Sequence, residues 1–192
     1  MDSNTITPTV AAAAISSAHA GNRNLSTDPK RMVYADAPEL LKTEGFPELV
    51  WGDDLGTPHE GRLTELMGAM FVTHYPADIK FFNMRNNDED PRVVNPNDLL
   101  LPLAGESAGA AEREFDGAKL RHKLETSSML AGPIRQGTKL EDFEWYPSFH
   151  EENEVALHSG AGVGMAHVAQ FILNQTDTRD CVPFLINREN VI

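Results

Sequence analysis

The chain has 192 residues, 29 of them acidic and 16 basic, so its formal net charge is −13. A surface this acidic repels phosphate backbones, and we expect no direct nucleic-acid partner. No apolar run reaches the roughly 18–20 residues of a membrane-spanning helix, so we predict a soluble protein without membrane contact. The single cysteine, Cys181, can form neither an intrachain disulfide nor a thiolate zinc site by itself.

Residues 1–30 are rich in Ser, Thr, Asn and Ala and show no helical or strand period. Such a segment buries too little to offset its own ordering entropy. We therefore expect an extended N-terminal arm that contacts neighbouring subunits. Residues 31–192 are expected to form a single α+β domain with several short strands and three to four helices. The apolar run of Val10–Ile15 is short and follows no basic residue, which predicts no signal peptide.

The clearest helical pattern runs from Thr57 to Tyr75, after a short helix predicted over Ala37–Leu41. Its inward stripe comprises Leu63, Leu66, Met67, Met70, Phe71 and His74, spaced as one face of an α-helix. Thr57 and Glu60 have the spacing of a capping box. Pro76 cannot continue the helix. We predict that the rest of the domain packs on this helix.

The middle of the chain is broken into shorter elements. A strand is predicted over Ile79–Met84, followed by a polar loop. The apolar run of Leu99–Leu103 contains Pro102, which favours an edge strand or a buried loop over a central strand. The glycines of 105–109 then interrupt the chain. Residues Ala110–Leu130 are predicted to form a helix that ends before Pro133.

The last third alternates short strands with one helix. Acidic and aromatic residues alternate over Leu140–Phe149, which predicts a half-buried strand. A second strand is expected over Val155–Leu157, a helix over Met165–Asn174 and an edge strand over Val182–Ile186.

A glycine-rich loop over residues 159–164, between a predicted strand and a helix, is the best candidate for a ligand site. Backbone N–H groups and a helix N-terminus can together bind a phosphate. The candidate ligand-binding residues are Ser159, Gly160, Gly162 and Gly164. The spacing is G-x-G-x-G, whereas the dinucleotide-binding fingerprint requires G-x-G-x-x-G. The alternative is a glycine turn that lets a helix pack closely on a strand.

A metal site is the second candidate. His150, Glu154 and His158 lie within nine residues of one another, and imidazole with carboxylate suits zinc, iron or manganese. The segment lacks the H-E-x-x-H spacing, and a solvated acidic loop is the alternative interpretation. We predict no cofactor.

No catalytic motif of useful specificity is present. The arm, the short segments and the lack of a specific catalytic motif lead us to predict a structural or assembly protein rather than an enzyme. It would be an oligomeric subunit or cement-like component of a viral or phage particle, with protein subunits as its partners. The alternative is an enzyme or small-ligand-binding subunit with its site at the loop 159–164 and nearby His and Glu residues.

Overall fold

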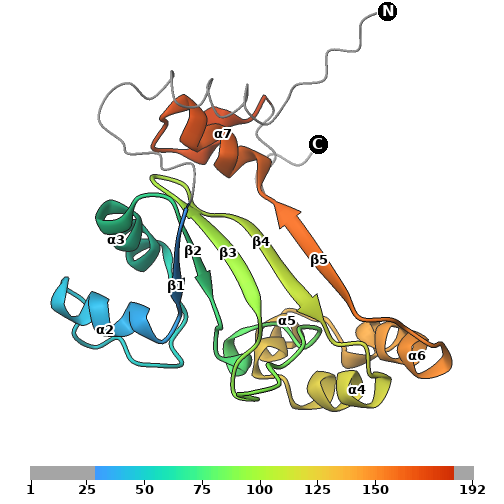
Figure 1. Cartoon of the computed structure of the whole chain (residues 1–192). Helices are drawn as coiled ribbons and strands as arrows, with labels where there is room; N and C mark the ends of the chain where they lie inside the picture. The colour runs from blue at the N-terminus through green and yellow to red at the C-terminus, as the bar shows by residue number, and fades with distance from the viewer. Residues whose placement is uncertain (1–28, 184–192) are drawn as a thin grey trace, which may run out of the picture.

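A computed structural model describes residues 29–183. The predicted arm, except for its last two residues, and most of the predicted strand Val182–Ile186 therefore lie outside the described residues. The described strands are β1 (Lys30–Val33), β2 (Met70–Thr73), β3 (Pro96–Leu101), β4 (Gly105–Arg113) and β5 (His158–Val163). The helices are α2 (Asp36–Thr43), α3 (Thr57–Met67), α4 (Gly117–Thr126), α5 (Ala131–Arg135), α6 (Trp145–Glu152) and α7 (Met165–Leu173) (Figure 1). The predicted single-domain α+β class is confirmed.

The five strands form one mixed sheet in the order β1-β2-β3-β4-β5. Strands β1 and β2 are parallel, and each later pair is antiparallel. The connection from β1 to β2 carries α2 and α3, as a parallel crossover requires. A register shift between Leu99 and Leu100 interrupts the pairing of β3 with β4.

The main hydrophobic core lies between this sheet and the helices α2 and α3. Met70, Val72 and Leu100 point from the strands toward Leu41 and Leu63 of the two helices, and all five side chains are buried. We call this side of the sheet the α3 face. Because side chains alternate along a strand, Phe71 and Leu99 point to the opposite side.

Two smaller clusters fix the remaining helices at opposite ends of the sheet. Leu120 and Leu124 of α4 pack with Phe82, while Phe143 and Tyr146 near α6 lie against the same cluster. At the other end, Phe171 of α7 packs with Leu101 and Ala104. Figure 1 shows β5 running from α6 at one end to α7 at the other.

The predicted helix of Thr57–Tyr75 is correct only in its first part. Helix α3 ends at Met67 because Gly68 adopts φ 78° and ψ −157°, a conformation that other residues avoid. The chain continues as β2, in which Met70 and Val72 are buried with a period of two. The capping prediction is also wrong: Gly56 caps the helix, and its N–H donates to Nδ1 of His59 at 3.1 Å.

The segment Leu140–Phe149 is helical where a strand was expected. Helix α6 begins at Trp145, so Pro147 falls in the first turn, where a helix tolerates proline. The predicted strand over Ile79–Met84 is likewise a 3₁₀ turn over Ala77–Ile79 followed by irregular chain. Tertiary packing of the aromatic side chains decides these segments, and their local alternation is misleading.

The middle strands are longer and more central than the sequence indicates. Strand β3 lies between β2 and β4 because it ends at Leu101, before Pro102. The glycines of 105–109 begin β4, and the predicted helix of Ala110–Leu130 is confined to α4 and the short turns after it. The predicted glycine-rich loop 159–164 is mostly strand β5, and the strand expected over Val155–Leu157 begins only at His158. Helix α7 lies where a helix was predicted. No helix within residues 29–183 is long and apolar enough to cross a membrane.

Candidate functional site on the sheet

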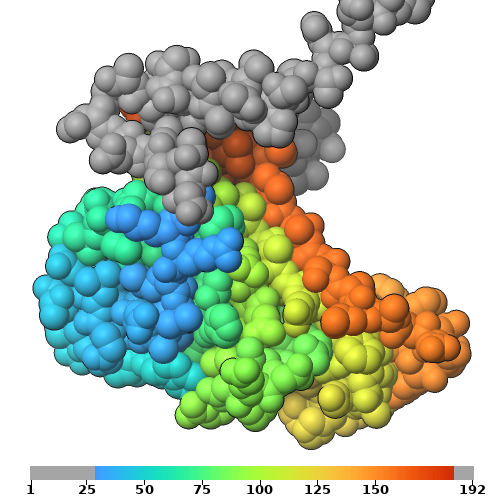
Figure 2. Space-filling view, in the orientation of Figure 1, coloured from blue at the N-terminus to red at the C-terminus, as the bar shows by residue number. Residues whose placement is uncertain are grey.

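Strands β3, β4 and β5 lie side by side and present polar residues and glycines on the α3 face, in the part of the sheet next to the main core. Asp98 of β3 is paired with Gly109 of β4, which is paired in turn with Gly162 of β5. The register shift places Glu106 opposite Leu100, a residue of the α3 face. The sheet therefore presents carboxylates beside backbone that carries no side chain, and Figure 2 shows β4 and β5 at the surface of the molecule.

A buried ion pair lies at the inner edge of this region. Nζ of Lys80 is 2.5 Å from Oδ2 of Asp98, and their side chains are only 15% and 5% exposed. The same ammonium lies 3.8 Å from the centre of the Tyr75 ring, a cation–π contact. Burial, with the nearby Asp98 carboxylate, raises the pKa of Tyr75, so its hydroxyl stays protonated. The pair gives the site a fixed positive and a fixed negative charge.

Two further carboxylates converge on the start of β4. Oε2 of Glu60, from α3, accepts a hydrogen bond from the backbone N–H of Glu106 at 3.0 Å. Burial, followed by the neighbouring carboxylates, raises the pKa of Glu60. Desolvation and the charge of Asp98 also raise the pKa of Glu106, although Lys80 and His167 oppose this shift. Both groups therefore hold a proton more readily than an isolated glutamate.

Glycines create the space in which these charges meet. A Cβ atom on Gly109 would lie 3.0 Å from Oε1 of Glu106 and 3.2 Å from Oδ1 of Asp98. On Gly160 it would lie 2.7 Å from Nε of Arg113, so the guanidinium covers this glycine. Nη1 of Arg113 also donates to Oδ1 of Asn83 at 3.4 Å. Only glycine admits these side chains so close to the strands.

An open cavity of about 430 Å³ adjoins this surface. It is lined by Glu106, Gly109, Gly162 and His167 among others. Nδ1 of His167 donates to the carbonyl of Ala104 at 2.7 Å, which fixes the ring at the rim of the cavity. The arrangement can accept N–H groups at its carboxylates and donate to oxygens from Arg113. We call the set Glu60, Lys80, Asp98, Glu106, Gly109, Arg113, Gly160 and Gly162 the sheet-face site.

The four glycine-run candidates do not share one surface. Gly160 and Gly162 belong to the sheet-face site. Ser159 pairs with Glu112 and points to the opposite side of the sheet. Gly164 caps α7, and its N–H donates to the carbonyl of Ser107 at 2.9 Å. The helix after the glycines was therefore predicted, whereas the strand formed by the glycines themselves and the face on which each residue lies were not.

The metal candidates are only partly brought together. The rings of His150 and His158 stack with centroids 6.2 Å apart. Nδ1 of His150 bonds to the carbonyl of Tyr146, and Nδ1 of His158 bonds to that of Ala156. Glu154 is exposed on the segment between them. Among residues 29–183, no group of three or more His, Cys, Asp or Glu side chains could hold a metal ion.

Most residues of the sheet-face site escaped the sequence analysis. Asp98 carried a usable signal, because it is the single charged residue in the apolar stretch Val93–Leu103. A carboxylate within such a strand requires a partner or a function. Lys80, Glu106 and Arg113 carry no comparable local signal, since their partners Asp98, Glu60 and Asn83 are distant in the sequence.

Comparison with known proteins identifies relatives of this chain. A family model described as tRNA synthetases class II (D, K and N) matches residues 4–188. An asparagine–tRNA ligase of Clostridium botulinum is 38% identical over 165 residues, which are 83% of this chain and 33% of the relative. The corresponding ligase of Clostridium beijerinckii is 34% identical over 168 residues. The chain spans about a third of the length of these relatives.

Solved structures agree with this match. Asparaginyl-tRNA synthetase from Pyrococcus horikoshii, complexed with asparaginyl-adenylate, superposes with a TM-score of 0.68 at 32% identity. That match covers 82% of this chain and 34% of the synthetase. The Entamoeba histolytica asparaginyl-tRNA synthetase, at 22% identity and a TM-score of 0.73, supports the fold; the match covers 91% of this chain and 39% of that one.

These relatives contradict the predicted function. The interpretation as a structural or cement-like component of a virus or phage is wrong, because the matching proteins are ligases of cellular organisms. The preference against an enzyme fails for the same reason. The exclusion of nucleic-acid partners, based on a net charge of −13, conflicts with relatives that act on tRNA. Net charge reports on the average surface and does not describe a local site. With a match that extends over residues 4–188, the chain belongs to the family of class II tRNA synthetases (D, K and N).

Proposed function

We propose that the sheet-face site binds an aminoacyl-adenylate, asparaginyl-adenylate or a close analogue, as part of an enzyme that attaches an amino acid to tRNA. One observation carries this proposal. The carboxylates of Glu60, Asp98 and Glu106 and the ammonium of Lys80 gather along β4 at Gly105 and Gly109, and Arg113 lies further along the same face, over Gly160 of β5. The Pyrococcus horikoshii relative in complex with asparaginyl-adenylate supports the choice of ligand.

The chemistry of the ligand complements these groups. Asparaginyl-adenylate carries an ammonium group, a carboxamide and an anionic acyl phosphate. Asp98 and Glu106 accept N–H groups, while the guanidinium of Arg113 donates to a carboxamide or phosphate oxygen. The bare backbone at Gly162, where a Cβ atom would meet nothing within 4 Å, lets a flat or extended ligand lie against β5.

Titration calorimetry with the non-hydrolysable sulfamoyl analogue of asparaginyl-adenylate tests this proposal. We expect the chain to bind the analogue and the isosteric change Glu106→Gln to weaken it about tenfold, because one charge-assisted hydrogen bond is lost. Glu125→Gln on α4 is the matched control, since it removes the same charge from an exposed position outside the site.

The aspartyl analogue distinguishes the side-chain group that is recognised. Weaker binding of the aspartyl form would indicate a carboxamide site. The proposal is wrong if the unaltered chain leaves both analogues unbound at millimolar concentration, or if Glu125→Gln weakens binding as much as Glu106→Gln does.

A further inference from the structure

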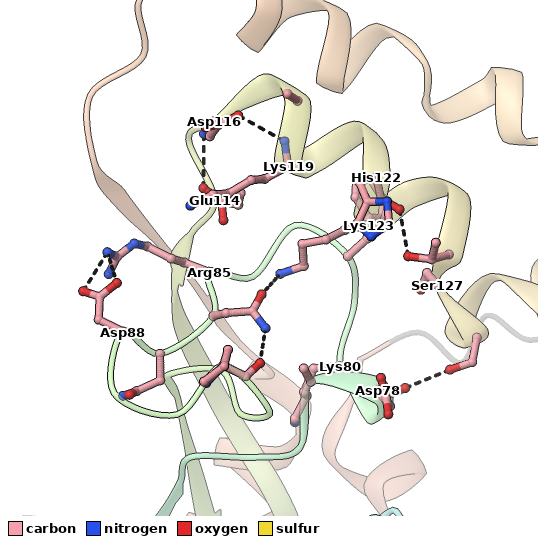
Figure 3. A pocket seen from close by; sticks show the side chains of 18 residues that line it. Asp78, Lys80, Arg85, Asp88, Glu114, Asp116, Lys119, His122, Lys123 and Ser127 are labelled. Atoms are coloured by element: carbon pink, nitrogen blue, oxygen red, sulfur yellow. Dashed lines mark hydrogen bonds and ion pairs between the residues drawn. The ribbon is translucent and has the colours of Figure 1, made fainter.

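A second, larger cavity lies between α4 and the irregular segment that follows β2. Its volume is about 770 Å³, and it shares only Lys80 with the sheet-face site. One wall consists of side chains from α4, and the opposite wall comes from residues 77–91 (Figure 3). The adenylate proposed above gives this cavity no role.

Three basic residues of α4 line the first wall. Lys119, His122 and Lys123 are spaced i, i+3 and i+4, so they share one side of the helix. They belong to the densest basic stretch of a chain whose net charge is −13. Arg121, from the same stretch, points elsewhere and is paired with Glu144 and Glu151. Arg121, which forms ion pairs, therefore lies on a different side of α4 from the three basic residues that line the cavity.

Within the described residues, the three basic side chains of α4 that line the cavity make no hydrogen bond or ion pair with a carboxylate. Within residues 29–183, neither the Lys119 ammonium nor the His122 ring has a hydrogen-bond acceptor or an ion-pair partner. The half-buried ammonium of Lys123 donates only to neutral acceptors, the carbonyl of Met84 and Oδ1 of Asn86. Burial lowers the pKa of Lys123, and the charge of Lys119 adds to this shift, although the Glu114 carboxylate opposes it.

Three of the acidic side chains that line the cavity, those of Asp88, Glu114 and Asp116, already accept hydrogen bonds. Asp88 holds Arg85 through both carboxylate oxygens, at 2.7 and 2.8 Å. Asp116 accepts from the N–H of Lys119, and Glu114 accepts from the N–H groups of Phe115 and Asp116. Asp78 lies well away from Lys119 at the other end of the view (Figure 3). The charges that remain to be matched near α4 are therefore positive.

We propose that this cavity binds a phosphate group between Lys119, His122 and Lys123. Three basic side chains that line one cavity and form no hydrogen bond to a carboxylate within the described residues suit phosphate oxygens. The group could be a phosphodiester of RNA or the terminal phosphates of a nucleotide, since both present the same oxygens. This inference concerns a different cavity from the proposed adenylate site and does not depend on it.

Binding measurements with three probes test the proposal: inorganic pyrophosphate, ATP and a single-stranded octaribonucleotide, each at low and moderate salt. We expect Lys119→Gln and Lys123→Gln each to weaken the probe that binds about tenfold. If RNA is the ligand, each change also lowers the slope of log affinity against log salt by about 0.7. If a nucleotide is the ligand, ATP or pyrophosphate binds and the octaribonucleotide does not compete.

Lys139→Gln is the matched control, because it removes one exposed positive charge outside the cavity. Thermal unfolding identifies variants that fail to fold; Lys119 is exposed, so Lys119→Gln keeps the test valid even if loss of the more buried Lys123 disturbs α4. The proposal is overturned if none of the three probes binds at millimolar concentration. It is also overturned if Lys139→Gln weakens binding as much as Lys119→Gln does.

Discussion

Asp98 is a buried carboxylate whose charge is balanced by one ammonium. Lys80 provides that ammonium at 2.5 Å, and the Tyr75 ring covers it. A buried pair of this kind contributes little compared with a well-packed apolar pair, but breaking it leaves a charge without compensation. The effect of the ion pair on the free energy of unfolding is therefore large only when one partner is removed.

We expect Lys80→Met to lower the free energy of unfolding by about 3–5 kcal/mol, because Asp98 stays buried without its counter-ion. Chemical denaturation measures the change. Lys42→Met breaks an exposed pair with Glu39 on α2 and should cost at most about 0.5 kcal/mol. Equal effects of the two substitutions would contradict the buried role of Lys80. The double variant Lys80→Met with Asp98→Leu should recover most of the lost stability.

At the scale of single residues, the sequence was informative where a residue type is unusual for its segment, such as repeated glycines. Gly160 and Gly162 were recognisable as a glycine pattern; the structure places Gly160 under the Arg113 guanidinium and Gly162 in the cavity that Glu106 also lines. Glu60 was interpreted as a helix cap, yet its carboxylate binds the N–H of Glu106, 46 residues further along the chain. A local rule cannot anticipate a partner at that distance.

At the scale of elements, one glycine decides where a helix becomes a strand. The apolar residues of Thr57–Tyr75 fit a helix throughout, but Gly68 ends α3 with φ 78°. Two residues later Met70 enters the sheet opposite Leu100. The helical stripe and the strand alternation share these residues, so periodicity alone could not separate them.

Gly68→Ala should destabilise the protein by about 1–2 kcal/mol, since alanine cannot adopt the observed backbone angles without strain. Gly61→Ala in the middle of α3 is the matched control. A Cβ atom there meets nothing within 4 Å, and alanine should stabilise the helix by up to about 1 kcal/mol. Thermal unfolding of both variants measures the difference. A stabilised Gly68→Ala variant would mean that α3 does extend toward Thr73.

In helix α6 the error is reversed, because a segment predicted to be a strand is a helix. Its acidic and aromatic residues alternate, and Pro147 suggested a broken strand. Tyr146 and Phe143 instead pack against the cluster that contains Leu120 and Leu124 of α4, and the proline occupies the first turn of α6. The elements with unambiguous signals, α2 and α7, were predicted closely because their apolar spacing has no competing strand interpretation.

At the scale of the whole molecule, function depends on which strands become neighbours. The sheet order brings residues of α3, β3, β4 and β5 together, from Glu60 to Gly162. One sequence predicts that strands exist, but it does not specify their register, and a shift by one residue would turn Asp98 away from Gly109. The family itself became evident from comparison, and the match extends over about a third of the relatives' length.

If the sheet-face site binds the proposed adenylate, the hydrogen bond from the N–H of Glu106 in β4 to Glu60 links that binding to proton release. Glu60 and Glu106 have raised pKa values, above the ordinary 4.5, so both are partly protonated in weak acid. A ligand ammonium placed beside them favours the ionised carboxylates, which lowers both pKa values and expels protons.

Titration of the sulfamoyl analogue in buffers of different ionisation enthalpy should reveal this linkage. Because both pKa values are raised, we expect net proton release in weak acid that declines as the pH rises above them, where both carboxylates are ionised before and after binding. Glu60→Gln should reduce the release, and Glu125→Gln should leave it unchanged. Proton uptake on binding would show that the ligand brings negative charge to these carboxylates. If protons are released as expected, the Glu60 carboxylate of helix α3 reports the occupancy of the site through its protonation.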